Sequence, residues 1–330
     1  MAAAPRRSDM EKQLFTLQWH ITHRCNLRCA HCYQNDYSAF PDKDELFAVI
    51  DDFEKLMEHT GFCGRMNITG GEPMTHPAVF LLLEELNRRS IPFAVLTNGT
   101  LIGKREARKL KELGAEYVQV SLDGMKKAHD KIRGEGSFDA AVQGLCRLLR
   151  EDLDATVSFT AQSGNIKELP KLARFCKDLG VKKLWYDRVV IPAPEDAEKL
   201  SLTKEQAQML MKTGVRLAKN HPVWNQRALQ FRYSGDRFVY SCEAGKHLLA
   251  LLADGTVMPC RRLPVTVGKL PENSLTEIWE TSPLLKELRE DQIPDDCSGC
   301  ENAPLCRGGA KCVAFAKTGE WRNRDPDCFL

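Results

Sequence analysis

The sequence has no segment that could cross a membrane and no marked excess of either charge. No stretch approaches the roughly 18 consecutive apolar residues of a membrane-spanning helix, and Arg6 and Arg7 near the start are not followed by the apolar run of a signal peptide. The 47 basic and 45 acidic residues leave a net charge of +2, which gives no argument for nucleic-acid or acidic-membrane binding. We therefore predict a cytoplasmic protein with neither kind of partner.

Disorder and secretion are also poorly supported by the composition. Only 16 of the 330 residues are proline, 43% are hydrophobic and 28% are charged, which excludes disordered, collagen-like and low-complexity classes. What the sequence does have is 13 cysteines, an odd number that cannot pair completely. Disulfide scaffolds are usually short chains without a core, whereas this length suffices for one large domain and a small one. We expect the thiols to remain reduced.

The cysteines divide the chain into three parts. Three lie together near the start and seven crowd the last quarter, which leaves Cys63, Cys146 and Cys176 in the long middle. We expect Cys146 and Cys176 to be packing residues, since they fall within apolar helical patterns. Cys63, ahead of the second expected strand, is also expected to pack, with a radical-quenching thiol as the alternative.

The middle of the chain alternates between strand-like and helix-like patterns. The expected strands are 15–21, 65–68, 93–96, 117–122, 154–160 and 183–190, and the expected helices are 44–59, 78–89, 104–113, 138–150, 167–179 and 203–220. Six βα units in series predict an α/β fold with a parallel sheet and helices outside it. Six units are too few to close an eight-stranded barrel, so we expect a partial (β/α)6 open barrel with its chemistry at the carboxyl ends of the strands.

The domain organisation follows from where this alternation starts and stops. We expect a flexible segment at 1–13, the barrel at 14–220 and a cysteine-rich domain at 221–330. In the last part only a short helix at 275–288 is expected, among loops organised by metal.

Three thiols, Cys25, Cys29 and Cys32, follow the first strand within eight residues. Thiolates at this density are soft ligands suited to iron–sulfur clusters or zinc. A cluster of four irons takes four ligands, so three cysteines leave one iron open to another molecule. The alternative is a structural zinc site completed by His23 or His31.

Three successive strands end in glycine and polar side chains. The segments are Thr69-Gly-Gly-Glu-Pro73, Thr97-Asn-Gly-Thr100 and Ser121-Leu-Asp-Gly124. Turn chemistry could explain any one of them. Because all three share the edge of the sheet that carries the cysteine triplet, a bound polar cofactor explains them better.

With these motifs, the chain from about residue 14 to its end resembles the radical S-adenosylmethionine (SAM) superfamily, in its branch with a C-terminal SPASM domain. The resemblance implies that Cys25, Cys29 and Cys32 are catalytic and hold a [4Fe-4S] cluster whose fourth iron binds SAM. It also implies that Glu72 and its glycines hold the SAM amino group, that Tyr33 lies near the adenine, and that Ser121 and Arg133 contact the ribose and the carboxylate. The expected cofactor-binding residues are Tyr33, Gly70, Gly71, Glu72, Pro73, Asn98, Ser121, Asp123 and Arg133.

The C-terminal cysteines resemble the two auxiliary iron–sulfur clusters of the SPASM arrangement. The resemblance implies an outer cluster and an inner one, held respectively by Cys297, Cys300, Cys306 and Cys328, and by Cys242, Cys260 and Cys312. Five residues separate Cys306 from Cys312 where the family commonly has three. The fourth inner position is open, binds substrate, or takes a ligand such as Asp236. A structural module with two zinc ions is the alternative.

The function that the resemblance implies is that of an oxidoreductase that cleaves SAM reductively. The resulting 5'-deoxyadenosyl radical abstracts hydrogen from a ribosomally made peptide or protein to give a crosslink, a thioether or an epimerised residue. Arg261 and Arg262 stand where the formylglycine-forming branch has an acidic residue, so that outcome is disfavoured.

The expected partners are the peptide substrate, a separate leader-binding protein and an external one-electron reductant such as flavodoxin or ferredoxin. Two alternatives stay open, namely an enzyme acting on a tetrapyrrole side chain and a zinc-dependent binding module without catalysis.

Overall fold

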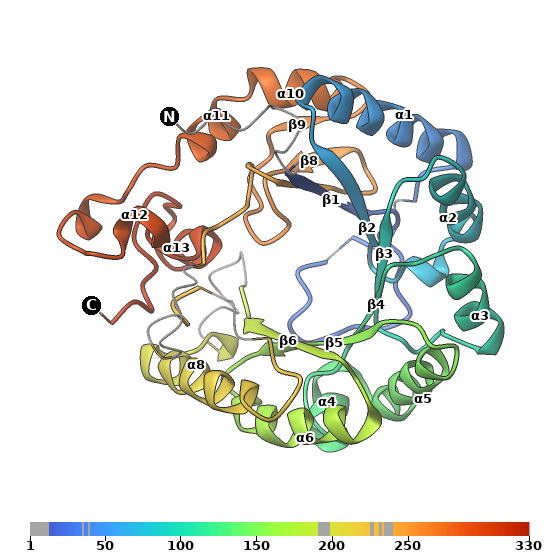
Figure 1. The fold of residues 1–330 in the computed structure, drawn as a ribbon, viewed down its shortest axis with the longest axis horizontal. Coiled ribbons are helices and arrows are strands. Elements are labelled where there is room, and N and C mark those ends of the chain that lie inside the picture. Colours follow the sequence, from blue (N-terminus) through green and yellow to red (C-terminus); the bar gives the residue numbers. More distant parts are fainter. Residues whose placement is uncertain are drawn as a thin grey trace, which may run out of the picture.

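One open, strongly curved sheet organises the molecule (Figure 1). The computed structural model describes residues 13–34, 36–38, 40–190, 199–224, 228–230, 233 and 240–329. Within them the strand order is β6-β5-β4-β3-β2-β1-β7-β8-β9. The first six strands are parallel: β1 (Leu14–His20), β2 (Cys63–Thr69), β3 (Phe93–Thr97), β4 (Val118–Ser121), β5 (Ala155–Ala161) and β6 (Lys183–Arg188). The predicted partial (β/α)6 open barrel is confirmed.

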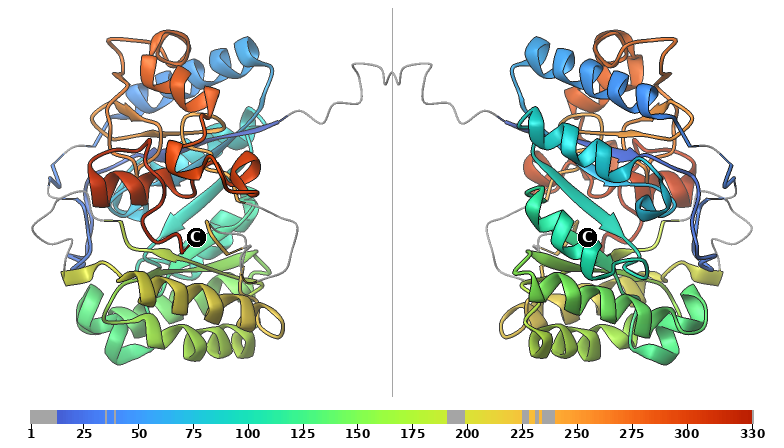
Figure 2. Two further views of the ribbon diagram at one scale, coloured as in Figure 1. Left: turned by 90° about the vertical axis from the view of Figure 1, so that its left-hand side faces the viewer. Right: turned by 90° about the vertical axis from the view of Figure 1, so that its right-hand side faces the viewer.

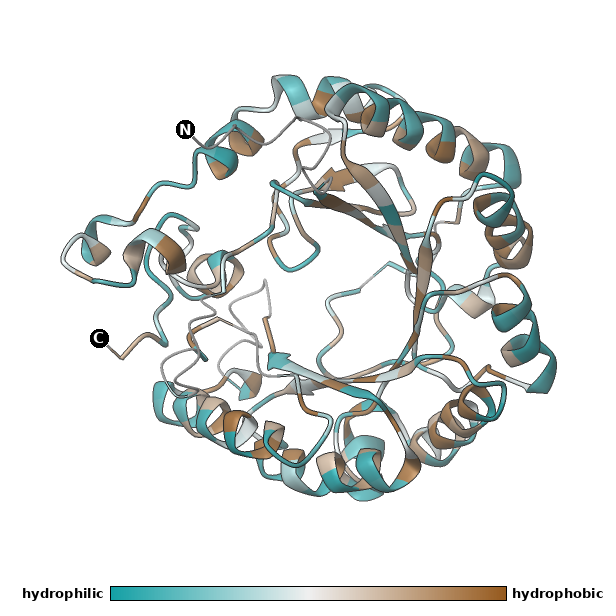
Figure 3. Ribbon diagram, viewed as in Figure 1, coloured by the Kyte–Doolittle hydropathy of each residue, from teal (hydrophilic) through white to brown (hydrophobic). Residues whose placement is uncertain are grey.

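Helices cover the convex face of this sheet because each strand alternates between two environments. In β1, Phe15, Leu17 and Trp19 are buried against the helices, whereas Thr16 and Gln18 point to the concave side. Figure 3 shows hydrophobic residues on the sheet-facing sides of the helices and hydrophilic residues outside. The surrounding helices are α1 (Lys43–Thr60), α2 (Val79–Arg88), α3 (Lys104–Glu112), α4 (Lys126–Arg133), α5 (Ser137–Arg150), α6 (Leu169–Leu179) and α8 (Lys204–Ala218). None of the helices described is long and apolar enough to cross a membrane.

The C-terminal region adds three strands that the sequence analysis missed. β7 (Leu248–Leu251) pairs in parallel with β1, and β8 (Thr256–Met258) and β9 (Gly268–Lys269) follow antiparallel. Strands this short give no readable period, and their pairing with β1 is a long-range contact. The sheet is therefore shared between the barrel and the cysteine-rich region.

The rest of the C-terminal region consists of short helices and loops. The helices are α10 (Leu275–Thr281), α11 (Pro283–Glu290), α12 (Ala303–Cys306) and α13 (Lys311–Thr318). Helix α10 lies beside α1, and α12 and α13 lie at the open side of the sheet (Figure 1 and Figure 2). The single helix expected at 275–288 is two helices, because Ser282 ends α10 and caps α11, where a proline takes the first position. Trp279 of α10 packs edge-on against Phe15 of β1, with ring centroids 5.5 Å apart.

Candidate active site

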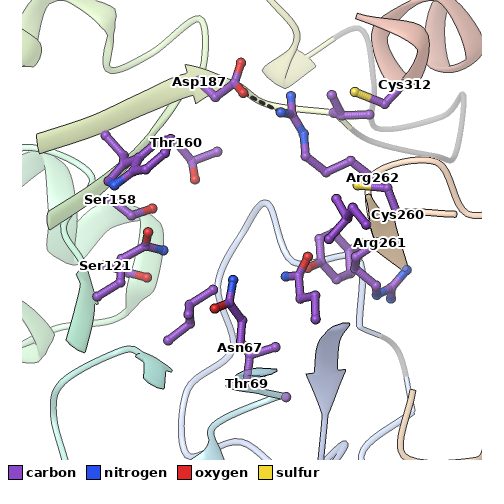
Figure 4. A pocket seen from close by; sticks show the side chains of 18 of the residues that line it. Asn67, Thr69, Ser121, Ser158, Thr160, Asp187, Cys260, Arg261, Arg262 and Cys312 are labelled. Carbon is purple, nitrogen blue, oxygen red and sulfur yellow. Dashed lines mark hydrogen bonds and ion pairs between the residues drawn. The ribbon is translucent and has the colours of Figure 1, made fainter. Parts of the chain in front are cut away.

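The concave side of the sheet encloses a cavity of about 840 Å³ (Figure 4). Its wall is formed by the inward-facing residues of successive strands, which recur at every second position. These residues include Thr16, Gln18, Arg65, Asn67, Thr69, Gln119, Ser121, Ser158, Thr160, Trp185 and Asp187. Uncharged amides and hydroxyls predominate among them, so the wall can both donate and accept hydrogen bonds.

Two separate groups of cysteines line this one cavity. Cys25, Cys29 and Cys32 reach it from the loop after β1. The other three, Cys242, Cys260 and Cys312, come from the C-terminal region. Residues more than 200 positions apart in the chain thus face the same enclosed space.

The first cysteine group sits in a loop rich in hydrogen-bond donors. The Leu27 amide lies 3.4 Å from Cys25 Sγ, and an Arg133 Nη1 lies 3.9 Å from Cys29 Sγ. Burial raises the pKa of Cys29 to about 11, so a thiolate there needs compensating positive charge. A cationic iron–sulfur centre supplies such charge, and the donor set fits it. No three ligand side chains in the described residues surround a single-ion position, so the ligand assignment rests on the motif and the family.

Gly70 and Gly71 line the cavity, but their close contacts are with backbone. A Cβ at Gly71 would lie 2.4 Å from the Arg24 carbonyl oxygen and 2.6 Å from that of His23. The Gly71 amide also donates to the Thr22 carbonyl at 2.8 Å. The glycines therefore let the turn after β2 press against the segment that leads into the cysteine loop, an arrangement that the sequence did not indicate.

Glu72 is fully buried beneath this turn and does not line the cavity. Its carboxylate accepts hydrogen bonds from the Thr97 hydroxyl and the Asn98 amide, both at 2.7 Å, and from the Met74 amide at 3.1 Å. Burial raises its pKa, although these donors act in the opposite direction. The side chain thus joins the ends of β2 and β3. Pro73 likewise lies outside the lining.

Arg133 and Asp123 form a buried pair at the edge of the cavity. Arg133 Nε donates to Asp123 Oδ2 at 2.6 Å, and Asp123 Oδ1 accepts from the Thr160 amide at 2.9 Å. Burial alone would raise the pKa of Asp123, but Arg133 and His31 outweigh it and the pKa lies below its usual value. Arg133 lines the cavity and Asp123 stands behind it as an anchor.

The other expected cofactor residues, Tyr33, Asn98 and Ser121, all line the cavity. Asn98 Nδ2 donates to Asn26 Oδ1 at 2.8 Å, within the cysteine loop. Tyr33 contacts the C-terminal region, because the Arg261 guanidinium lies 3.9 Å from the centre of its ring. This cation–π contact was not expected from the sequence.

The C-terminal cysteines fall into the two groups expected from the sequence. Cys242, Cys260 and Cys312 lie within electrostatic range of one another, and burial raises the pKa of Cys312 to about 12. The second group shows the same mutual proximity and consists of Cys297, Cys300, Cys306 and Cys328. Asp236, considered as a further inner ligand, lies outside the described residues.

Of the three middle cysteines, only one is a fully buried packing residue. Cys176 is buried and Cys146 partly buried, as their helical patterns predicted. Cys63 is exposed at the start of β2, so the prediction that it packs is wrong. Edge and end positions of a strand are not distinguished by a local apolar pattern.

An ion pair between the two halves of the site was missed by the sequence analysis. Arg262 pairs with Asp187 at the end of β6, and its Nη2 donates to the Arg188 carbonyl at 2.8 Å. Figure 4 shows this pair bridging the cavity wall beside Cys312. No local pattern pointed to it, because the partners are far apart in the sequence.

Comparison with known proteins agrees with this geometry. A model described as the radical SAM superfamily matches residues 19–184, and the SPASM model, an iron–sulfur cluster-binding domain, matches residues 242–301. An AdoMet-dependent heme synthase of Methanosarcina barkeri is 26% identical over 95% of both chains. The mycofactocin maturase MftC of Mycolicibacterium smegmatis is 27% identical over 94% of this chain and 82% of that protein.

Two solved structures share the fold. One is anSMEcpe with bound AdoMet and Cp18Cys peptide, with a TM-score of 0.77 and 20% identity over 94% of this chain and 93% of that one. The other is Streptococcus suis SuiB bound to its precursor peptide SuiA, with a TM-score of 0.72 and 17% identity over 97% and 76%.

Proposed function

Because this chain belongs to the radical SAM superfamily and carries a C-terminal SPASM domain, we propose that it modifies a ribosomally made peptide or protein. It is an enzyme whose cofactors are SAM, a [4Fe-4S] cluster and auxiliary iron–sulfur clusters. When bound, SAM and the first cluster supply a 5'-deoxyadenosyl radical that removes a hydrogen atom from substrate. The zinc-binding module without catalysis is therefore wrong.

The observation that carries the proposal is the shared cavity of the two cysteine groups. Cys25, Cys29 and Cys32 would hold the first cluster on one side, and Cys242, Cys260 and Cys312 the inner auxiliary cluster on the other. A substrate in this cavity would face both groups. A cluster held there would supply an acceptor for the one further electron that forming a crosslink releases after hydrogen abstraction, or a site that ligates a substrate thiolate.

The protein's own residues hold and enclose the reactants. Arg133, anchored by Asp123, offers guanidinium N–H groups to the SAM carboxylate, and Ser121 offers a hydroxyl to the ribose. Glu72 acts through the backbone that it fixes, which makes it a positioning residue.

A peptide fits the wall of the cavity better than a tetrapyrrole does. Three of its arginines already have carboxylate partners, since Arg65 pairs with Glu116, Arg133 with Asp123 and Arg262 with Asp187. The remaining polar wall is mostly amide and hydroxyl, which complements peptide groups. The peptide named in the SuiB structure and the maturase MftC support the same substrate class.

A tetrapyrrole side chain remains the second candidate substrate. It is favoured by the heme synthase that matches over 95% of both chains. A tetrapyrrole carries several carboxylates, which would need several cationic partners in the cavity. The pairing of most of its arginines is the reason we place the peptide first.

The proposed function is tested by anaerobic reconstitution followed by two assays. The protein is incubated with SAM, dithionite and the product of a short reading frame beside its gene, and the peptide is weighed by mass spectrometry. We expect 5'-deoxyadenosine and a peptide that has changed mass. An iron porphyrin with carboxylate side chains is tested in parallel. If it alone is altered, the second candidate is established and the first overturned.

The triplet itself is tested by substitution. The variant Cys25→Ala/Cys29→Ala/Cys32→Ala should form no 5'-deoxyadenosine while it retains the iron of the C-terminal region. Undiminished SAM cleavage by that variant would contradict the assignment. Replacing dithionite with flavodoxin or ferredoxin, and adding a separate leader-binding protein where one is encoded nearby, tests the two partners that we propose.

A further inference from the structure

Arg261 differs from the other arginines that line the cavity. It is only 9% exposed, and its Nε is buried without a hydrogen-bond partner. Among the described residues its guanidinium has no ion pair, and its one specific contact is the ring of Tyr33 at 3.9 Å. Arg262, the next residue, turns away toward Asp187 (Figure 4). Within the part of the chain that the structure describes, Arg261 is thus a largely buried cation whose Nε–H has no acceptor.

The surroundings of Arg261 add further unmatched nitrogen atoms. His20 Nε2 and His23 Nδ1 are also buried without a hydrogen-bond partner. Burial, Arg261 and His23 together lower the pKa of His20 to about 3, which shows that these groups share one corner and that His20 is neutral there. None of the described groups that act on His20 is a carboxylate. Asp36 Oδ2 lies 3.8 Å from His23 Nδ1, but no carboxylate of the described residues pairs with Arg261, so its positive charge is unmatched there.

An arrangement of this kind is costly unless something binds to it. A buried donor without an acceptor has lost its hydrogen bonds to water without replacement, and the loss of stability is greater when the donor is charged. Arg65, Arg133 and Arg262 avoid this cost through Glu116, Asp123 and Asp187. Because Arg261 lines the same cavity, a carboxylate entering that cavity is the group that would match its planar fork of N–H donors.

We propose that Arg261 binds a carboxylate of the substrate, either the chain end of a peptide or an aspartate or glutamate side chain. The inference rests on the proposed function and narrows it to substrates with a carboxylate near the modified residue. SAM also carries a carboxylate, but we assign that carboxylate to Arg133, which lies beside Cys29. Arg261 approaches from the C-terminal region, on the side of Cys260.

The test compares two small probes that differ only in charge. Reconstituted holoenzyme with SAM is mixed with N-acetylglycine or N-acetylglycinamide, and binding is measured by saturation-transfer NMR. We expect the acid to bind at least about tenfold more tightly than the amide, the size of a charge-assisted pair. Arg261→Gln should remove this preference, and Arg261→Lys, which keeps the charge but not the fork, should retain part of it.

Arg65→Gln is the matched control, because it removes a cavity arginine that already pairs with Glu116. It should keep the preference for the acid. Iron content and SAM affinity of each variant are measured alongside, so that misfolding is detected. An unchanged preference in Arg261→Gln overturns the proposal. So does a loss of SAM affinity alone, which would assign Arg261 to SAM.

The outcome does not depend on which substrate is finally found. The preference for the acid is measured without turnover, so a failure to modify any peptide would count against the proposed function only. Conversely, a modified peptide whose processing is equal in Arg261→Gln and the wild type would count against Arg261 only.

Discussion

At the scale of single residues, His20 shows how the fold sets a charge state. It lies on the inward face of β1, is 2% exposed, and burial is the largest cause of its low pKa of about 3. An unfolded histidine has a pKa near 6.5. Between these values the unfolded chain binds more protons than the folded one, so stability falls as the pH drops below about 6.5.

This difference gives a measurable pH dependence. Between pH 7.5 and 5.5 the histidine should cost the protein about 1.4 kcal/mol of unfolding free energy. In the variant His20→Gln, this contribution to the loss of stability between the two pH values should be absent. Urea unfolding at the two pH values measures it, and an equal loss in both proteins would show that His20 is not buried as a neutral group.

Glu72 is the second residue whose buried side chain leads to a prediction. All three of its hydrogen-bond partners are donors. Glu72→Gln places an amide N–H₂ against at least one of them, and we expect a loss of roughly 1–3 kcal/mol in stability together with weaker SAM binding. Thermal unfolding and SAM titration check this. Full SAM affinity in a destabilised variant would restrict Glu72 to a purely structural role.

At the scale of elements, the turn after β2 determines where the cysteine loop lies. Gly71 packs on the backbone carbonyls of His23 and Arg24, which cannot yield as a flexible side chain would. Gly71→Ala should therefore displace the cysteine loop, reduce the iron bound at the first cluster and abolish SAM cleavage. Iron analysis and 5'-deoxyadenosine formation provide the measurement.

The control for this change is Gly164→Ala in the loop after β5. A Cβ at Gly164 meets nothing within 4 Å, and its backbone is not in the left-handed region. Gly164→Ala should change the free energy of unfolding by less than about 1 kcal/mol and leave SAM cleavage intact. If Gly71→Ala behaved like Gly164→Ala, the close approach of turn and loop would not matter.

At the scale of the whole molecule, Arg188 ties the barrel to the chain end. Its guanidinium, buried at the end of β6, donates to Asp325 at 2.8 Å and to Asp327 at 2.6 Å. Cys328 follows directly. Arg188→Met would leave two buried carboxylates with less positive charge, which should cost about 3–5 kcal/mol.

We expect this variant to lose iron from the outer group of cysteines while the first cluster remains. Thermal unfolding and iron analysis test it. Arg322→Met is the control, because Arg322 is 57% exposed and its pair with Glu287 lies at the surface. That change should cost less than about 1 kcal/mol. Equal effects of the two substitutions would mean that the buried pair does not hold the chain end.

Two features show what could not be predicted from the sequence, namely the last strands of the sheet and the burial of Glu72. The long amphipathic helices and the first six strands were predictable, because their periods are local properties of the chain. The strands β7 to β9 were not, since four, three and two residues carry no period. Glu72 was identified as a site residue, but its burial depends on Thr97 and Asn98, 25 and 26 residues away.

The sequence by itself determined the chemistry of this protein, because cysteine number and spacing set how many ligands each cluster can receive. The separation of outer from inner C-terminal cysteines came from the resemblance to the SPASM arrangement. Only the tertiary structure decided that the first and inner groups face one cavity, that Asp187 pairs with Arg262, and that no described carboxylate pairs with Arg261. Such facts depend on contacts between residues far apart in the chain, which a pattern along the sequence does not record.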